Sequence, residues 1–188
     1  MAPPPLADRV ELHWPTEADT QAWAQRLAAC PQVRNATVTL HGDLGAGKTT
    51  LVRHLLRALG VRGRIKSPTY AVVEPHEAPG PDGPLGIWHF DFYRLDDPRE
   101  WEDAGLREVL GGPGLKLVEW PEKAGPHGPV ADLAVALQVG PQDDRLATVT
   151  ALTAHGRAWL QAVQPAEAPI LVAPIAPSTP PAHGATGT

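Results

Sequence analysis

The spacing of apolar residues changes repeatedly along the chain between two patterns. Apolar side chains at alternating positions, or in short continuous runs, are typical of strands, whereas a spacing of three or four is typical of one helix face. Strands are expected over residues 36–41, 70–74, 87–91, 115–119, 133–139 and 146–153. Helices are expected over residues 16–29, 49–59 and 97–110, the last with Asp97 as its N-cap and Pro98 at its first position.

This order of elements predicts the fold class. Strands that alternate with helices indicate an α/β fold whose sheet contains parallel pairs. We expect a central, mostly parallel sheet flanked by helices, with the last two strands antiparallel at its C-terminal side. Residues 77–86 carry four turn signals in ten positions, so we expect a loop or the tip of a hairpin there.

Proline-rich segments mark both ends of the chain. Residues 2–5 read Ala-Pro-Pro-Pro, and the chain after residue 164 is rich in proline and alanine. Proline at this density interrupts helices and central strands. We therefore expect a flexible N-terminus over residues 1–9, one folded domain over 10–163 and a disordered tail over 164–188.

One segment between a predicted strand and a predicted helix matches the phosphate-loop pattern G-x-x-x-x-G-K-S/T. Its glycines allow successive backbone N–H groups to point at phosphates, the lysine reaches the β- and γ-phosphates, and the threonine hydroxyl holds Mg²⁺. The segment predicts a P-loop NTPase fold with ATP and Mg²⁺ as ligands. The residues expected to bind the nucleotide here are Gly42, Asp43, Leu44, Gly45, Ala46, Gly47, Lys48, Thr49 and Thr50.

The identity of the base follows from what the sequence lacks. Guanine-specific P-loop proteins recognise their base through an N-K-x-D loop, but Asn35 is the one asparagine of this chain and belongs to no such motif. The D-x-x-G motif of those GTPases is also missing. ATP is therefore favoured.

Two carboxylates stand at the ends of predicted strands, where α/β folds bind their ligands. Asp91 and Glu119 each follow an apolar run, and either could position Mg²⁺ or the attacking water. Asp91 could instead be a turn acid. Trp120 follows Glu119 directly, and it could pack on the nucleotide, on a partner or half-buried in the core.

Three other polar segments leave alternatives open. Ser67 and Thr69 flank a proline and could form a switch that senses the γ-phosphate or Mg²⁺, or an ordinary turn. His89 is interpreted as a packed, hydrogen-bonded histidine rather than a catalyst. Arg94 could pair with an acid or act on phosphate.

Charge is distributed unevenly. The chain carries a net charge of −5, which disfavours binding of DNA or RNA through its overall field. Residues 44–73 nevertheless contain no acid and six bases, namely Lys48, Arg53, Arg57, Arg62, Arg64 and Lys66. This basic face could dock onto an acidic partner, or onto RNA held by a partner, or it could be an ordinary solvated helix face.

The cellular compartment is indicated by two features. Cys30 is the one cysteine of the chain, so an intrachain disulfide or a cysteine-cluster zinc site is excluded. No apolar run is long enough for a membrane span, and the first residues do not resemble a signal peptide. We expect a cytoplasmic protein that binds no membrane.

Four motifs in a fixed order make the chain resemble a known family. The motifs are GDLGAGKTT (42–50), SPTY (67–70), HFDFYRLDDP (89–98) and VEWPEKA (118–124). Together they resemble the bacterial TsaE family, formerly called YjeE, over about residues 11–156. The combination is far more specific than the phosphate loop alone.

The resemblance implies an ATPase that works with the TsaB–TsaD pair. That assembly attaches a threonylcarbamoyl group to the adenosine next to the anticodon of tRNA, and the TsaE component would meet tRNA only through the complex. Its ATP cycle would activate or reset the complex. Since no arginine finger evidently reaches its own site, we expect weak ATP hydrolysis by the chain alone and stimulation by the partner.

The resemblance also assigns roles by position. Lys48 would be the phosphate lysine, Thr49 and Glu119 the Mg²⁺ ligands, and Asp91 a second metal-site or catalytic acid. Trp120 would lie near the nucleotide. Residues 14–17, Thr16 among them, would approach the base side of ATP.

Two other functions remain open on the residues alone. One is a small-molecule P-loop kinase, although no arginine-dense lid is evident after residue 94. The other is a nucleotide-gated docking module that binds ATP without meaningful turnover.

Overall fold

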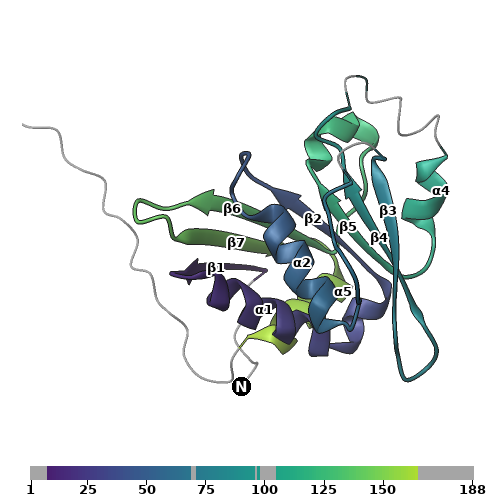
Figure 1. Cartoon of the computed structure of the whole chain (residues 1–188), viewed down its shortest axis with the longest axis horizontal. Helices are drawn as coiled ribbons and strands as arrows, with labels where there is room; N and C mark the ends of the chain where they lie inside the picture. Colours follow the sequence, from purple (N-terminus) through teal and green to yellow (C-terminus); the bar gives the residue numbers. More distant parts are fainter. Residues whose placement is uncertain (1–7, 69–70, 96, 98–104, 165–188) are drawn as a thin grey trace, which may run out of the picture.

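Seven strands form one sheet in the computed structural model, which describes residues 8–68, 71–95, 97 and 105–164. The order across the sheet is β1-β7-β6-β2-β5-β4-β3 (Figure 1). The strands are β1 (Arg9–Trp14), β2 (Ala36–His41), β3 (Val73–Ala78), β4 (Leu85–Asp91), β5 (Leu115–Glu119), β6 (Leu133–Val139) and β7 (Arg145–Ala151).

The centre of the sheet is parallel. Strand β2 pairs in parallel with both β5 and β6, and β5 pairs in parallel with β4. The pairs β6–β7, β1–β7 and β3–β4 are antiparallel. The predicted α/β fold and its antiparallel C-terminal pair are therefore confirmed, but the expectation of a mostly parallel sheet is wrong, because three of the six strand pairs are antiparallel and only the centre is parallel. Because parallel strands end at the same edge, the last residues of β2, β4 and β5 meet there.

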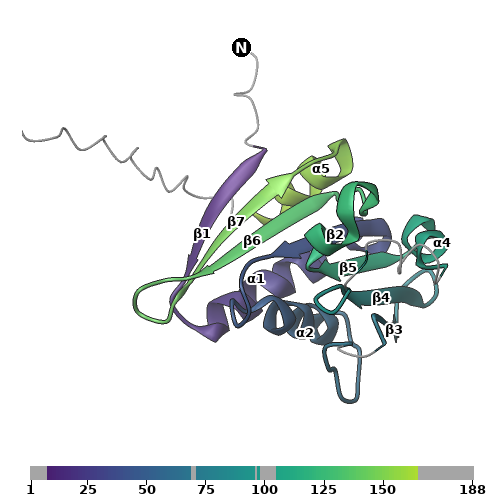
Figure 2. The ribbon, with the colours of Figure 1, turned by 90° about the horizontal axis from the view of Figure 1, so that it is seen from above.

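Helices cover the sheet. Figures 1 and 2 show α1 (Glu17–Ala29) and α2 (Lys48–Ala58) side by side on one face. The shorter helices are α4 (Leu106–Gly111) and α5 (Ala154–Val163), and two 3₁₀ segments are η1 (Pro31–Asn35) and η2 (Pro121–His127). None of the described helices combines the length and the apolar character that a membrane crossing requires.

The burial pattern explains why these strands are central. All five residues of β5 are buried, as are the first five of β2, which is expected for parallel strands covered on both faces. The indole Nε1 of Trp159 in α5 donates a hydrogen bond to the carbonyl of Leu27 in α1 and so ties the two helices together. This packing holds the carboxyl ends of β2 and β5 in place.

Two elements were not predicted. Strand β1, at the sheet edge, alternates half-buried Val10 and Leu12 and buried Trp14 with exposed neighbours, a strand pattern that the sequence prediction missed. Helix α5 buries Trp159, Leu160 and Val163, and Thr153 caps it by accepting a hydrogen bond from the N–H of Gly156. The region of the expected disordered tail, residues 165–188, lies outside the described residues, as do residues 1–7 of the expected flexible N-terminus. Arg9, which was expected to be flexible, begins β1.

Two predicted elements need correction. The strand expected over 70–74 is displaced, since β3 runs from Val73 to Ala78 and the hairpin tip comprises residues 79–84. Pro75 is tolerated within β3 because β3 is an edge strand. A continuous helix over 97–110 is wrong, because Gly105 adopts a left-handed conformation (φ 71°) and α4 begins only after it. Residues 98–104 of that expected helix lie outside the described residues.

Candidate functional site

A glycine-rich loop, residues 42–49, joins the end of β2 to the start of α2. Gly42 has φ 129°, and a Cβ there would lie 2.3 Å from the carbonyl oxygen of Leu137. Gly47 caps α2 in a left-handed conformation with φ 105°. Glycine is required at both positions, because other residues adopt such φ values only under strain.

The start of α2 presents backbone donors. Within the described part of the chain, the amides of Gly47, Lys48 and Thr49 donate to no acceptor. Amides at the first turn of a helix lack intrahelical partners, and the helix dipole adds partial positive charge at the same end. This end of α2 is therefore suited to an anion.

Lys48, the first residue of α2, is a buried cation beside the loop. Its side chain is only 4% exposed, and its Nζ donates to the carbonyl oxygens of Gly42 at 2.5 Å and Asp43 at 2.9 Å. The Nζ also lies 4.0 Å from the centroid of the Trp120 ring. Burial lowers the pKa of Lys48, and nearby carboxylates, Glu119 foremost, oppose that shift.

The first residues of α2 meet the last residue of β5. The hydroxyl of Thr49 lies 3.0 Å and 2.9 Å from the two carboxylate oxygens of Glu119. Glu119 is 2% exposed, and its Oε1 lies 2.8 Å from Nε2 of the fully buried His89. The carboxylate is thus held from two sides.

The second strand-end carboxylate lies beside the first. Asp91 is the register partner of Glu119 across the parallel pair β4–β5. Its Oδ2 accepts a hydrogen bond from the hydroxyl of Ser67, and its Oδ1 accepts one from the backbone N–H of Tyr93 at 3.0 Å. The hydroxyl of Ser67 is therefore coupled to the carboxyl edge of the sheet. Thr69, the other expected switch residue, lies outside the described residues.

Trp120 has an unusual backbone. Its φ is 55° and its ψ is 49°, a left-handed conformation that costs energy for a residue with a large side chain. Its amide donates to the carbonyl oxygen of Leu40, and its ring packs against Tyr93 with 5.0 Å between centroids. The half-buried ring thereby lies over Lys48, so the structure brings Trp120 to the loop.

Two adjoining cavities share Gly45, Gly47 and Thr50 of the loop region. The first, which we call the polar cavity, has a volume of about 420 Å³. The second, which we call the outer cavity, has a volume of about 430 Å³. The polar cavity is lined by Leu44, Gly45, Gly47, Lys48, Thr49, Thr50, Ser67, Asp91, Tyr93, Arg94, Glu119 and Trp120.

The polar cavity collects most of the residues predicted for phosphate and metal binding. Arg94 also lines it, which is compatible with the interpretation that Arg94 acts on phosphate. Ala46, at 1% exposure, lines the outer cavity instead, and the side chain of Asp43 is exposed to solvent. The residues that line the cavity therefore include two cations, two carboxylates and four hydroxyl-bearing side chains.

The outer cavity lies between the start of α1 and the loop. Trp14, Thr16 and Glu17 line it, as expected for residues 14–17. Trp14 is buried against Trp23, with 5.3 Å between ring centroids, so it shapes the wall from the core. The amide and the hydroxyl of Thr16 both donate to the carboxylate of Asp19, which holds Thr16 in place.

Sequence reasoning missed the residues of the β6–β7 hairpin. Gln142, Asp143 and Arg145 line the outer cavity opposite α1. The Nε of Arg145 lies 3.6 Å from where a Cβ on Gly47 would be, and its guanidinium donates to the backbone carbonyl and carboxylate of Asp143. The sequence shows only a polar hairpin tip here, and nothing in it indicates that the tip folds against the loop.

The donor set fits a magnesium nucleotide. Mg²⁺ takes oxygen ligands and is held by a few protein groups together with substrate phosphates. The hydroxyl of Thr49 and the carboxylates of Glu119 and Asp91 are oxygen donors on one side of the polar cavity, and Lys48 and the free amides face the same space. These residues could hold Mg²⁺ and phosphates side by side.

Comparisons with known proteins show which family the chain resembles. Residues 14–147 match the model of the family described as threonylcarbamoyl adenosine biosynthesis protein TsaE. A tRNA threonylcarbamoyladenosine biosynthesis protein TsaE from Bacillus subtilis is 35% identical over 144 residues, which cover 76% of this chain and 87% of that protein. The protein of the same name from Haemophilus influenzae is 47% identical over 98 residues, covering 52% of this chain and 60% of that one.

A solved structure is also similar. The crystal structure of YdiB from Bacillus subtilis superposes with a TM-score of 0.64 at 27% sequence identity. The match covers 82% of this chain and 93% of YdiB. The described fold is therefore that of a known α/β protein over nearly its full length.

Proposed function

The chain belongs to the family of threonylcarbamoyl adenosine biosynthesis proteins TsaE, and from this membership we propose that it is a P-loop ATPase that serves tRNA threonylcarbamoyladenosine formation. It binds ATP with Mg²⁺ and hydrolyses the γ-phosphate. The relatives are named for the biosynthesis of the modified nucleoside, and the chemistry proposed for this chain is the nucleotide cycle within it.

One observation carries the proposal. The glycine-rich loop, the buried Lys48 and the Thr49–Glu119 contact converge on one cavity at the carboxyl edge of the parallel strands. Phosphoryl transfer requires little covalent chemistry from a protein, so that positioning and electrostatics supply most of the rate. A cavity with this arrangement supplies the positioning of the phosphates and the electrostatic stabilisation.

Each residue has a part that follows from its position. Amides at the start of α2 and the ammonium group of Lys48 hold the phosphates. Thr49 and Glu119 are the proposed Mg²⁺ ligands, and the metal would neutralise charge on the phosphate oxygens. Asp91, held by Ser67, is placed to orient the water that attacks the γ-phosphate. Ser67 would thereby couple the segment before it to the state of the nucleotide.

The outer cavity suits the nucleoside part of ATP. It adjoins the loop on the side away from Asp91 and Glu119, and both polar and apolar side chains line it. Thr16 and Trp14 contribute from the N-terminal segment, and the hairpin tip closes the opposite wall. The two cavities together accommodate a nucleoside triphosphate laid across Gly45 and Gly47.

We further propose that the chain acts together with the TsaB–TsaD pair and is stimulated by it. Arg94 lines the polar cavity, but an additional cation from a partner can raise the rate of phosphoryl transfer by about 10³–10⁵-fold. Weak hydrolysis by the isolated chain is therefore expected. A small-molecule kinase is disfavoured because, among the residues that the structure describes, Arg94 is the one arginine that lines the polar cavity, whereas kinase lids carry several.

The test is ATP hydrolysis by the chain alone and after addition of the TsaB–TsaD pair and tRNA. Lys48→Ala serves as the inactive control, and Asp91→Asn and Glu119→Gln should lose hydrolysis more than nucleotide binding. Stimulation that vanishes in Lys48→Ala supports the proposal. ATP binding without stimulation would contradict the partner role, and transfer of the γ-phosphate to a metabolite would favour the kinase alternative.

A further inference from the structure

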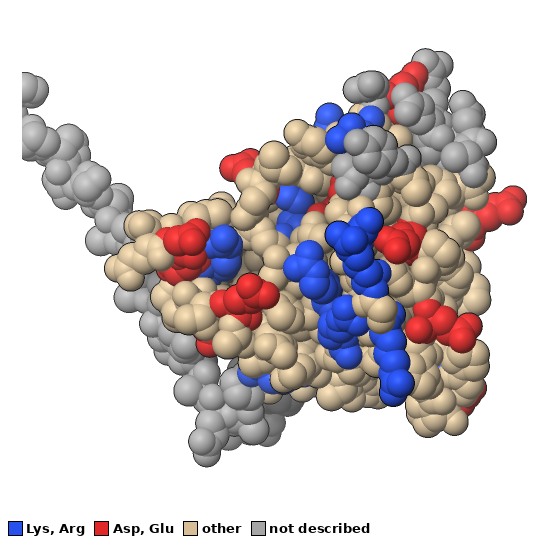
Figure 3. All heavy atoms as spheres, viewed as in Figure 1, with Lys and Arg blue, Asp and Glu red and all other residues tan. Residues whose placement is uncertain are grey.

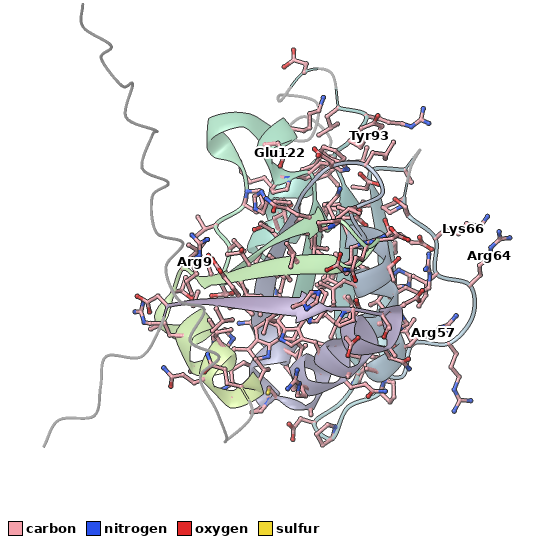
Figure 4. The ribbon with its side chains drawn as sticks, turned by 90° about the vertical axis from the view of Figure 1, so that its left-hand side faces the viewer. Arg9, Arg57, Arg64, Lys66, Tyr93 and Glu122 are labelled. Carbon is pink, nitrogen blue, oxygen red and sulfur yellow. The ribbon has the colours of Figure 1, made fainter. Side chains whose placement is uncertain are left out.

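A group of five cations lies outside the two cavities and has no part in the proposed ATP chemistry. We define this basic surface as Arg53, Arg57, Arg62, Arg64 and Lys66. All five side chains are exposed. Figure 3 shows lysine and arginine side chains gathered together on the face that α2 covers. Figure 4 shows Arg57, Arg64 and Lys66 projecting from the same edge of the molecule.

Local structure holds these side chains outward. Arg53 and Arg57 stand four residues apart on the exposed side of α2, so they lie on one helix face. Arg57 donates to the backbone carbonyls of Val61 and Gly63 and so fixes the segment that follows the helix. Val61 is buried, which anchors the start of that segment.

The rest of the segment continues the pattern. Ile65 is buried between Arg64 and Lys66, and Arg62 and Arg64 are separated by exposed Gly63. The buried aliphatic residues hold the backbone against the core, and the cations between them face solvent. The positive charges therefore have a fixed arrangement along one face of α2 and the segment that follows it.

Among the described residues, these cations have no carboxylate partner. None of the five forms an ion pair with any residue that the structure describes. Elsewhere the chain does pair its arginines, as in Arg9 with Glu11 and Arg145 with Asp143. Clustered like charges repel one another, so this arrangement favours the binding of an anion.

The surface also lacks the features of a protein interface. Stable protein interfaces have an apolar centre with a polar rim. The large apolar side chains that are exposed on the described residues are Leu44, Tyr93, Val130, Val139, Leu146 and Leu152, and none of them falls within residues 51–66. Four of the five cations are arginines, whose guanidinium groups match phosphate geometry. The chemistry favours phosphates over an acidic protein.

We propose that this basic surface binds the phosphodiester backbone of RNA directly, with tRNA as the RNA concerned. The choice of tRNA rests on the proposed function. Lys66 immediately precedes Ser67, which bonds to Asp91 in the polar cavity, so bound RNA would lie next to the element that contacts the ATP site. With no exposed large apolar or aromatic side chain within residues 51–66, the contact is to backbone rather than to stacked bases.

The experiment measures tRNA binding by the full chain through filter retention over a series of salt concentrations. The triple variant Arg53→Gln/Arg62→Gln/Arg64→Gln removes charge without touching Arg57, which supports the loop. Binding should weaken at least 10-fold, and the slope of log K against log salt should fall in magnitude by about 2, since each lost phosphate contact contributes about 0.7 to 0.9. Arg9→Gln, an exposed arginine on the other side of the molecule in Figure 4, is the matched control and should bind normally.

The outcomes separate this inference from the proposed function. ATP hydrolysis measured on the same preparations should be equal in the wild type and the triple variant, because none of the three arginines lines either cavity. Unchanged tRNA affinity and salt slope in the triple variant would overturn the RNA surface while leaving the ATPase proposal intact. If the wild type bound no tRNA and the triple variant lost binding to the TsaB–TsaD pair, the RNA surface would also be overturned, in favour of an acidic protein partner.

Discussion

The Nε2 atom of His89 lies 2.8 Å from Oε1 of Glu119 in the interior of the sheet, where neither side chain reaches solvent. On its other side the same carboxylate faces the hydroxyl of Thr49. A buried carboxylate is costly unless hydrogen bonds satisfy it. His89 therefore acts as a positioning residue, which fixes Glu119 in the orientation that the proposed metal site needs.

Removing this support should weaken metal binding without unfolding the site. We expect His89→Ala to lower ATP hydrolysis by about 10- to 100-fold and to raise the Mg²⁺ concentration needed for half-maximal activity, as is usual for partners of metal ligands. His89→Gln can offer an amide donor near the position of Nε2 and should recover part of the loss. Equal Mg²⁺ requirements in the wild type and His89→Ala would show that His89 is only a packing residue.

The loop depends on glycine for two separable reasons. At Gly42 an added Cβ would lie 2.3 Å from a backbone oxygen, that of Leu137, and the φ of 129° is also unfavourable. At Gly45 the φ is 83°, but no atom lies within 4 Å of an added Cβ. We expect Gly45→Ala to cost about 1 kcal/mol in the free energy of unfolding and Gly42→Ala clearly more.

The measurement is urea unfolding of both variants. Gly45→Ala is the matched control, because it carries the backbone strain without the steric clash. Since 1 kcal/mol shifts the melting temperature of a domain of this size by about 2–4 °C, the two variants should be resolved by thermal unfolding too. Equal destabilisation of the two would refute the contact with Leu137.

The sequence predicted the parts of this site that local patterns encode. The loop follows from its glycines, and Asp91 and Glu119 follow from carboxylates placed at the ends of apolar runs. The role of His89 could not be derived, because it depends on the register that sets β4 beside β5. Arg145 was missed for the same reason, since its closeness to Gly47 arises from the way a distant hairpin folds against the loop.

Edge elements were the least predictable parts of the fold. Strand β1 does alternate apolar Val10, Leu12 and Trp14 with polar residues, but it is short and directly follows the proline-rich N-terminus, which favours an irregular segment in a prediction from sequence. The predicted strand ended before Pro75, whereas β3 includes this proline. Proline is disfavoured in a central strand but is compatible with an edge strand such as β3. Central strands were placed within one or two residues, since burial on both faces leaves a continuous apolar run.

Arg145 provides a test of the outer cavity. Its guanidinium is held by Asp143 beside the glycine-rich loop, where it adds positive charge to the wall that faces a bound nucleotide. We expect Arg145→Ala to weaken ATP binding roughly 10-fold, the effect of one charge-assisted contact, with little change in stability. Isothermal titration with ATP measures this, and Arg9→Ala is the control. An unchanged affinity would remove the hairpin tip from the nucleotide site.

The half-buried imidazole of His76 predicts how stability depends on pH. Burial lowers the pKa of His76, and nearby His89 lowers it further against the opposing effect of Glu74. Its Nε2 is buried and has no hydrogen-bond partner among the described residues. Burial also lowers the pKa of His41. Protonating either group in the folded state is therefore unfavourable.

The sign of the effect follows from proton linkage. Below the ordinary histidine pKa of about 6.5 the unfolded chain binds more protons than the folded one, so the free energy of unfolding decreases as pH falls through this window. His76→Gln removes one of the groups responsible. Its urea midpoint should therefore fall less than that of the wild type between about pH 7.5 and 5.5, a range chosen around that ordinary pKa. The exposed His155→Gln serves as the matched control and should retain the wild-type fall. A fall in His76→Gln as steep as in the control would show that the protonation of His76 is not linked to folding.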